Sequence, residues 1–228
     1  MAHLNYDVLV GGFHCVKDDE LQIFSDTQHF SRHVKAMLTV RDDAMNKTGE
    51  RKAYIASLIC DADDLSERWN IALELGVDGV LIARFIQGFS ALTKLARQKE
   101  LPILAHNTCS ELLTRNPDWG IHERVWTHWL RHCGADWLVT NGGFGQHLLS
   151  NAFEQEVLCA MLEPLENEFS AVMPILQGGK RPEELTQYRD CCGQVNFMLI
   201  AANWLDNHPQ GLLYAANYFR NAVSALEN

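Results

Sequence analysis

The chain has 228 residues and a mass of 25.8 kDa, with 47% hydrophobic and 21% charged residues, which is typical of one folded domain with a sizeable core. The formal net charge of −10 argues against nucleic acids and anionic membrane surfaces as partners. The sequence lacks the apolar run of about 20 residues that a transmembrane helix needs, and its seven scattered cysteines are typical of a protein from a reducing cytoplasm.

Short apolar runs alternate with longer amphipathic stretches along the chain. The predicted strands span residues 11–16, 53–59, 79–83, 103–106, 137–140, 174–176 and 197–201. The predicted helices span residues 27–46, 65–75, 89–98, 122–132, 153–169, 182–191 and 212–226. No stretch has the composition of a linker, so residues 1–228 are predicted to form a single α/β domain. Its βα units favour a parallel sheet covered by helices, either a (β/α) TIM-type barrel or a doubly wound sheet.

Polar residues follow most of the predicted strands, and this favours the barrel. They are residues 17–20, His106 and Asn107, residues 140–143, residues 177–179 and Asn203. In a parallel barrel the carboxyl ends of all strands converge on one mouth, where active sites form. The sequence therefore predicts a TIM-type barrel of about seven βα units with its functional residues at that mouth.

The tetrapeptide Lys17-Asp18-Asp19-Glu20 crowds one lysine and three carboxylates against the end of the apolar run 8–16. Alternate residues of a strand point to opposite sides, so Lys17 and Asp19 would share one face. A tight turn after Asp19 would bring Glu20 to that face, and two carboxylates would then face one point, as a Mg²⁺ ion requires. Lys17 fits this set as a carbamate formed with CO₂, which makes the amine a third oxygen ligand. The alternative is a solvated charged turn.

Residues 11–20, with the sequence GGFHCVKDDE, are followed by further segments in a characteristic order. These later segments are residues 88–91, 102–106, 134–136, 141–142, 174–179 and 208–211. In these segments and in their order, the chain resembles the C-terminal barrel domain of the RuBisCO large chain and of the RuBisCO-like (type IV) proteins. The resemblance covers nearly the whole chain.

The resemblance implies roles for individual residues. Lys17 matches the carbamylated lysine, Asp19 and Glu20 match Mg²⁺ ligands, and Asp18 falls between ligand positions and is expected to be structural. His106 matches a catalytic histidine, although a lone histidine at a strand end is more often a satisfied polar residue. A further set matches substrate-binding and phosphate-binding segments: Asn107, Asn141, Gly142, Gln177, Gly178, Gly179, Ala201 and Ala202.

The chain also departs from the carboxylating members of that family. Gln146 stands where they have a loop lysine, Asn107 where they have an arginine, and Gln177 where they have a serine. Ala201 and Ala202 replace glycines of the last phosphate loop. These departures imply a RuBisCO-like lyase or isomerase. It would carry out Mg²⁺-dependent enolisation, isomerisation or decarboxylation of a phosphorylated keto-sugar or keto-acid, and not CO₂ fixation.

By the same resemblance the chain begins just before the second barrel strand of the family, so the N-terminal domain and the first barrel strand are expected to be absent. An open sheet edge exposes unpaired N–H and C=O groups. We therefore expect a homodimer, or a heteromer with a separate N-terminal piece. The alternative function is a non-catalytic or truncated subunit that needs a partner chain to complete the site.

Overall fold

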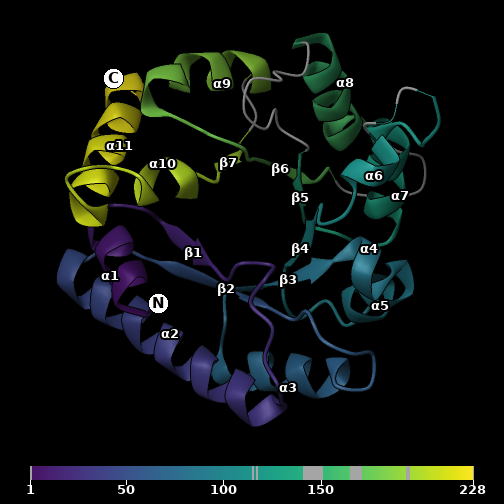
Figure 1. Cartoon of the computed structure of the whole chain (residues 1–228), viewed down its shortest axis with the longest axis horizontal. Coiled ribbons are helices and arrows are strands. Elements are labelled where there is room, and N and C mark those ends of the chain that lie inside the picture. The colour runs from purple at the N-terminus through teal and green to yellow at the C-terminus, as the bar shows by residue number, and fades with distance from the viewer. Residues whose placement is uncertain are drawn as a thin grey trace.

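The computed structural model describes residues 2–114, 116, 118–140, 151–164, 171–193 and 196–227. Within them, seven parallel strands form one sheet that curls into a half-barrel, and helices cover its outside (Figure 1). The strands are β1 (Cys15–Lys17), β2 (Ala53–Ser57), β3 (Gly79–Ala83), β4 (Ile103–His106), β5 (Trp137–Val139), β6 (Met173–Leu176) and β7 (Met198–Leu199).

The strand order confirms the TIM-type barrel. Each strand pairs in parallel with its neighbour in the sequence, from Cys15 opposite Ala53 to Leu176 opposite Leu199. A doubly wound sheet reverses its strand order at a switch point, and the described strands show no reversal. The doubly wound alternative is therefore wrong.

Helices follow the strands in the predicted places, with additional short ones. They are α1 (Ala2–Val10), α2 (Thr27–Thr48), α3 (Leu65–Leu75), α4 (Arg84–Gln87), α5 (Phe89–Ala96), α6 (Glu111–Thr114), α7 (Glu123–His132), α8 (Asn151–Leu162), the 3₁₀-helix η1 (Pro182–Glu184), α9 (Leu185–Cys192), α10 (Ala202–Asp206) and α11 (Leu212–Glu227). Residues 165–169 of the helix predicted over 153–169 lie outside the described residues. Within the described ranges, no helix combines the length and the apolar character needed to cross a membrane.

Local sequence signals set the ends of α2, the helix that carries residues next to the site. The Asp26 side chain accepts a hydrogen bond from the His29 N–H over 2.6 Å, which satisfies one of the unpaired donors of the first turn. At the other end, Gly49 adopts a left-handed conformation with φ of 71°, which glycine adopts without strain. The long helix therefore begins and ends where its own sequence dictates.

Strands β2 to β6 are largely buried on both faces, as expected of a parallel barrel, whereas most residues of β1 and β7 are half-buried. One apolar cluster contains strand and strand-end residues but no helix residue, and so fills the inside of the curve: Ile55, Ile59, Leu81, Ala83, Leu104, Val139 and Ile175. A larger cluster lies between the strands and the helices and includes Phe30, Trp69 and Leu92. These two layers fix the strands, and therefore the positions of the polar residues at their ends.

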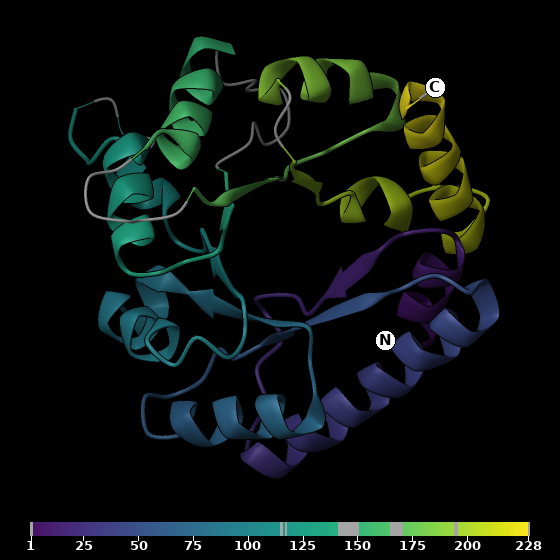
Figure 2. The same ribbon diagram turned by 180° about the vertical axis from the view of Figure 1, so that it is seen from behind.

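The strand predicted over residues 11–16 is wrong at its start. The run of apolar residues 8–10 closes helix α1, and β1 begins only at Cys15. Helix α1 packs against α2 and α11, and it lies beside α11 in Figure 1 and, from behind, in Figure 2. A Cβ atom on Gly11 would lie only 2.4 Å from the Cβ of Ala216. Glycine therefore permits a close helix contact that local sequence patterns do not reveal.

Candidate active site

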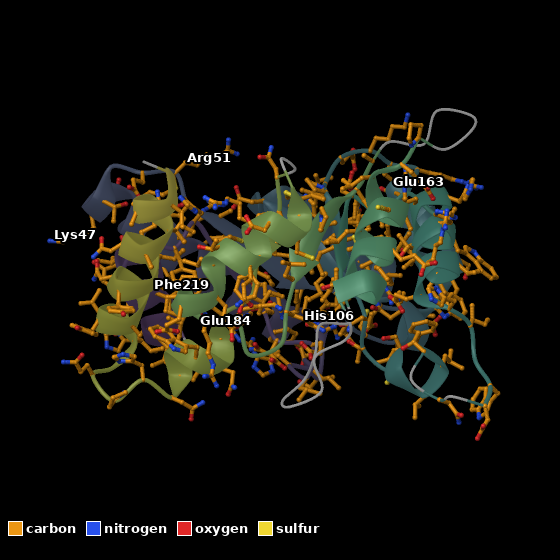
Figure 3. All side chains as sticks on the ribbon, turned by 90° about the horizontal axis from the view of Figure 1, so that it is seen from above. Lys47, Arg51, His106, Glu163, Glu184 and Phe219 are labelled. Carbon is orange, nitrogen blue, oxygen red and sulfur yellow. The ribbon has the colours of Figure 1, made fainter. Side chains whose placement is uncertain are left out.

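Three predicted site residues lie together at the carboxyl ends of β1 and β4. Glu20 Oε2 lies 3.5 Å from Lys17 Nζ and 3.5 Å from His106 Nε2. The exposed fractions of the Lys17, Glu20 and His106 side chains are 17%, 26% and 4%. Figure 3 shows His106 toward the opposite side of the molecule from Arg51, which precedes β2. The mouth of the half-barrel thus gathers an amine, a carboxylate and an imidazole.

A turn after Asp19 brings Glu20 to Lys17. The Asp19 carbonyl accepts a hydrogen bond from the Gln22 N–H (3.1 Å), and Asp19 Oδ1 accepts one from the Leu21 N–H (2.8 Å). This is the turn that the sequence required if Glu20 was to join Lys17. The exposed Asp19 carboxylate is held within the turn by its bond to the Leu21 N–H.

Asp18 points away from this cluster, into the layer between the sheet and α2. Its side chain is 1% exposed. Oδ2 accepts hydrogen bonds from the Tyr54 hydroxyl (2.7 Å) and the Ser57 N–H (3.1 Å), and Oδ1 lies 2.8 Å from His33 Nε2. Three partners on β2 and α2 therefore fix the position of Asp18.

His106 is held as a neutral imidazole. Its Nδ1 accepts a hydrogen bond from the Thr108 N–H (3.2 Å) and lies 2.7 Å from Thr108 Oγ1. An accepting Nδ1 leaves the ring proton on Nε2, the atom that faces Glu20. Burial, assisted by the positive charges of Lys17 and Arg84, lowers the pKa of His106 to about 3. At neutral pH the ring offers an N–H donor.

A buried ion pair close to His106 was missed by sequence reasoning. Arg84 follows directly after Ala83, the residue of β3 that pairs with His106. Arg84 Nη2 lies 3.0 Å from Glu123 Oε1, and both side chains are almost fully buried. Burial lowers the pKa of Arg84 and raises the pKa of Glu123, and the attraction between the two groups opposes both shifts. The one feature of the sequence that could have indicated Arg84 as a site residue was a charged residue directly after an apolar strand.

Two predicted substrate-binding residues bond to each other across the mouth. Gln177 Nε2 donates a hydrogen bond to Asn107 Oδ1 over 2.8 Å, and both side chains are buried. Asn107 follows β4 and Gln177 follows β6, so the bond connects two strand ends that are far apart in the sequence. The positions at which carboxylating relatives are expected to have an arginine and a serine therefore hold a pair of neutral amides.

The other predicted residues that the structure describes follow β6 and β7. Gly178 and Gly179 have φ values of 82° and 59°, which glycine adopts without strain. Ala201 is buried and Ala202 begins α10. Asn141 and Gly142, with Gln146, lie outside the described residues.

A polar pocket of about 320 Å³ lies beside Gly179. It is lined by Gly179, Arg181, Asn203, Trp204, Asn207, His208 and Pro209. Its guanidinium, imidazole and amide groups suit a polar or anionic part of a small molecule. Of these residues, Gly179 was predicted to bind substrate, Asn203 was predicted to lie at the mouth, and His208 and Pro209 lie in segment 208–211 of the resemblance. Arg181, Trp204 and Asn207 were not predicted, because single residues of these types carry no specific pattern.

Comparison with known proteins gives a consistent result. The family model described as ribulose bisphosphate carboxylase large chain, catalytic domain, matches residues 1–228. The chain is 27% identical over 228 residues to a ribulose bisphosphate carboxylase-like protein of Chlorobaculum tepidum, covering 99% of this chain and 52% of that protein. It is 26% identical over 222 residues to a 2,3-diketo-5-methylthiopentyl-1-phosphate enolase of Bacillus pumilus, covering 95% of this chain and 53% of the enolase.

The fold agrees with solved structures of the same group. The octameric ribulose-1,5-bisphosphate carboxylase/oxygenase of Pyrococcus horikoshii OT3 matches with a TM-score of 0.90 and 25% sequence identity, over 98% of this chain and 54% of that chain. The chain spans about half the length of the curated relatives that it matches. Because the family model covers all of its residues, the chain belongs to the family of the RuBisCO large chain catalytic domain.

Proposed function

We propose that the protein is a RuBisCO-like, Mg²⁺-dependent enzyme that enolises, isomerises or decarboxylates a phosphorylated keto-sugar or keto-acid and does not fix CO₂. The observation that carries the proposal is the convergence of Glu20 on Lys17 and His106 at the barrel mouth. Similarity to an enolase that acts on a diketo phosphate supports a substrate with a carbonyl group and a phosphate.

The residues at the mouth fit a Mg²⁺ ion if Lys17 is carbamylated. Asp19 and Glu20 supply two carboxylates from one turn, and Mg²⁺ prefers oxygen ligands. Among the described residues, no three His, Cys, Asp or Glu side chains are arranged to hold a metal ion, so the Lys17 carbamate is an essential part of the proposal. When bound, the ion would stabilise negative charge on the substrate oxygens during enolisation.

His106 would act as a hydrogen-bond donor to a substrate oxygen. Its Nδ1 accepts a hydrogen bond from Thr108, and its Nε2, which carries the ring proton, lies 3.5 Å from Glu20 Oε2. A fixed N–H donor in a buried site stabilises negative charge that develops on an oxygen without solvent reorganisation. Because Nδ1 is already hydrogen-bonded and Nε2 already carries a proton, His106 is not suited to act as the base. Of the two candidates for that role, His106 and carbamylated Lys17, we favour Lys17.

The amide pair supports the exclusion of CO₂ fixation. Asn107 and Gln177 bond to each other and bring no positive charge to the mouth. A substrate with phosphates at both ends needs cationic or N–H partners at each end. We therefore propose a substrate with a single phosphate, oriented toward the loops that follow β6 and β7.

Solvent deuterium exchange tests the enzymatic proposal. The protein, with MgCl₂ and bicarbonate in D₂O, is given 2,3-diketo-5-methylthiopentyl 1-phosphate and a panel of phosphorylated ketoses. NMR is used to follow loss of the C–H signal next to the carbonyl. We expect exchange with wild type and at least tenfold slower exchange with Lys17→Ala and Glu20→Gln. Equal rates in wild type and Lys17→Ala for every probe would overturn the proposal.

A subunit that needs a partner chain is the second candidate. The observation that favours it is the strand order, in which β1 and β7 each have one neighbour among the described strands. A homodimer, or a heteromer with a separate N-terminal piece, would cover these edges. Native mass spectrometry of protein from its source decides, because a second polypeptide would appear in the mass. A monomer that exchanges substrate protons rapidly would reject this candidate.

A further inference from the structure

One imidazole contacts both ends of the turn that carries Asp19 and Glu20. His33, on α2, places Nε2 2.8 Å from Asp18 Oδ1 and Nδ1 3.4 Å from Gln22 Nε2. Asp18 precedes the turn, and the Gln22 N–H closes it. We propose that His33 is a positioning residue that clamps the turn and so fixes where Asp19 and Glu20 present their carboxylates. The purpose of this clamp rests on the proposed function.

The two ring nitrogens of His33 suit a bridge between two unlike groups. The side-chain nitrogen of Gln22 can only donate, so Nδ1 of His33 accepts and the ring proton lies on Nε2. That proton points at the Asp18 carboxylate, which can only accept. Lysine and arginine have no acceptor and could not contact Gln22 in this way. One imidazole ring therefore contacts both ends of the turn at once.

The Asp18 end of the clamp is fixed to the sheet. The Tyr54 hydroxyl and the Ser57 N–H both donate to Asp18 Oδ2, and Tyr54 is completely buried. Burial, together with the Asp18 charge, raises the pKa of Tyr54, so the phenol keeps the proton that it donates. Asp18 therefore has a fixed position relative to β2, and His33 extends this constraint to Gln22.

The imidazole is itself held in place. Its ring lies 4.9 Å from the Phe24 ring, with an angle of 41° between the ring planes. The Phe24 carbonyl accepts a hydrogen bond from buried Arg68 Nη2 over 2.9 Å, and the guanidinium carbon lies 6.0 Å from the centre of the Phe24 ring. Supporting contacts of this kind hold ligand-bearing residues in a productive geometry. His33 is therefore a preorganised contact and not a mobile surface histidine.

Two substitutions test the two contacts of His33 one at a time. In His33→Gln the amide lies near the position of the histidine Nε2 and keeps a donor for Asp18. In His33→Asn the amide lies near the position of Nδ1 and keeps a contact to Gln22. The matched control is His29→Gln, because His29 lies one turn earlier on α2 and contacts the same Phe24 ring at 5.6 Å.

The first measurement is amide hydrogen exchange in the metal-free protein. The reporting groups are the Leu21 and Gln22 N–H, which close the turn on Asp19. We expect exchange at both to rise on the order of threefold to tenfold in His33→Gln and His33→Asn, the effect of one lost hydrogen bond. In the His29→Gln control, amide exchange at Leu21 and Gln22 should stay at the wild-type rate. Unchanged exchange in both His33 variants would overturn the clamp.

The second measurement is the rise in Tm on adding Mg²⁺ with bicarbonate. We expect this rise to shrink by at least half in both His33 variants and to stay at the wild-type value in His29→Gln. Faster exchange combined with an unchanged rise would show that the clamp is purely structural and would reject the positioning role. If wild type itself shows no rise, the proposed metal site fails, and hydrogen exchange alone then decides whether the clamp exists.

Discussion

Arg84 Nη2 lies 3.0 Å from Glu123 Oε1, and this ion pair joins the end of β3 to the first turn of α7 inside the protein. Within the described part of the chain, Arg84 Nε has no hydrogen-bond partner. Removing two charges from water costs several kcal/mol per ion, and mutual attraction repays this only when the geometry is good. The pair is thus of modest net value, while each partner depends strongly on the other.

We expect Arg84→Met to lower the free energy of unfolding by about 3–5 kcal/mol, because it leaves the Glu123 carboxylate buried without its partner. The double variant Arg84→Met with Glu123→Leu should recover most of this loss, since both charges are then gone. Urea unfolding of the wild type and of these two variants measures both effects. A double variant as unstable as Arg84→Met would contradict the expectation.

Asp18→Ala should cost about 3 kcal/mol of stability, because it leaves the Tyr54 hydroxyl, the Ser57 N–H and His33 without their common acceptor. Asp19→Ala is the matched control, since Asp19 is the adjacent residue but is exposed. We expect the control to cost about 1 kcal/mol or less. Chemical denaturation distinguishes the two, and similar losses would show that the buried network contributes little.

The low pKa of His106 predicts a specific pH dependence of stability. The unfolded chain protonates this ring near its ordinary pKa of 6.5, whereas the native protein resists protonation until about pH 3. Between these values the unfolded state binds more protons, so stability falls as pH decreases from 6.5 toward 3 and is unaffected above 6.5. At pH 5 the penalty is about 2 kcal/mol.

His106→Asn should remove this part of the pH dependence. The measurement is the difference in unfolding free energy between wild type and variant at several pH values from 7.5 to 4.5, which cancels the other titrating groups. We expect the difference to change by on the order of 2 kcal/mol across that range. A difference that stays constant would show that His106 titrates normally in the native protein.

Bicarbonate with Mg²⁺ should stabilise wild type more than Mg²⁺ alone. A ligand that binds only the native state raises stability by mass action, by about 2.7 kcal/mol at a hundred times its dissociation constant. Lys17→Ala cannot form the carbamate and should show no added effect of bicarbonate. Thermal melts of both proteins, with chloride replacing bicarbonate as the salt control, give the answer. The same bicarbonate effect in both proteins would reject the carbamate.

Local patterns were sufficient to predict most elements of the fold. The apolar runs that became β2 to β6 are bounded by turn residues, and α3 lies over residues 65–75 as predicted. The hydrogen bonds that close the predicted turn after Asp19 also involve only neighbouring residues. Features set by short stretches of sequence could therefore be derived without the structure.

Contacts between distant segments could not be derived in this way. The close approach of Gly11 to α11 joins residues far apart in the sequence, and so does the contact of His33 with Asp18. Arg84 and Glu123 are similarly separated in the sequence, and the residue pattern of neither segment indicates the other residue. Such pairs become visible only when the barrel places their elements together.

The contact between Gly11 and α11, called the joint here, sets the order in which the chain is expected to fold and to open locally. Every described strand pairs with its neighbour in the sequence, whereas α1 and α11 are the first and last described helices and meet only when the curve is complete. Closing a long loop costs entropy before its contacts form, so this joint should form last during folding. The native protein should therefore open first between α1 and α11, as faster amide exchange in α1 than in β3 would show. Opening there would widen the mouth beside Lys17 while the β3–β4 pairing that positions His106 remains intact.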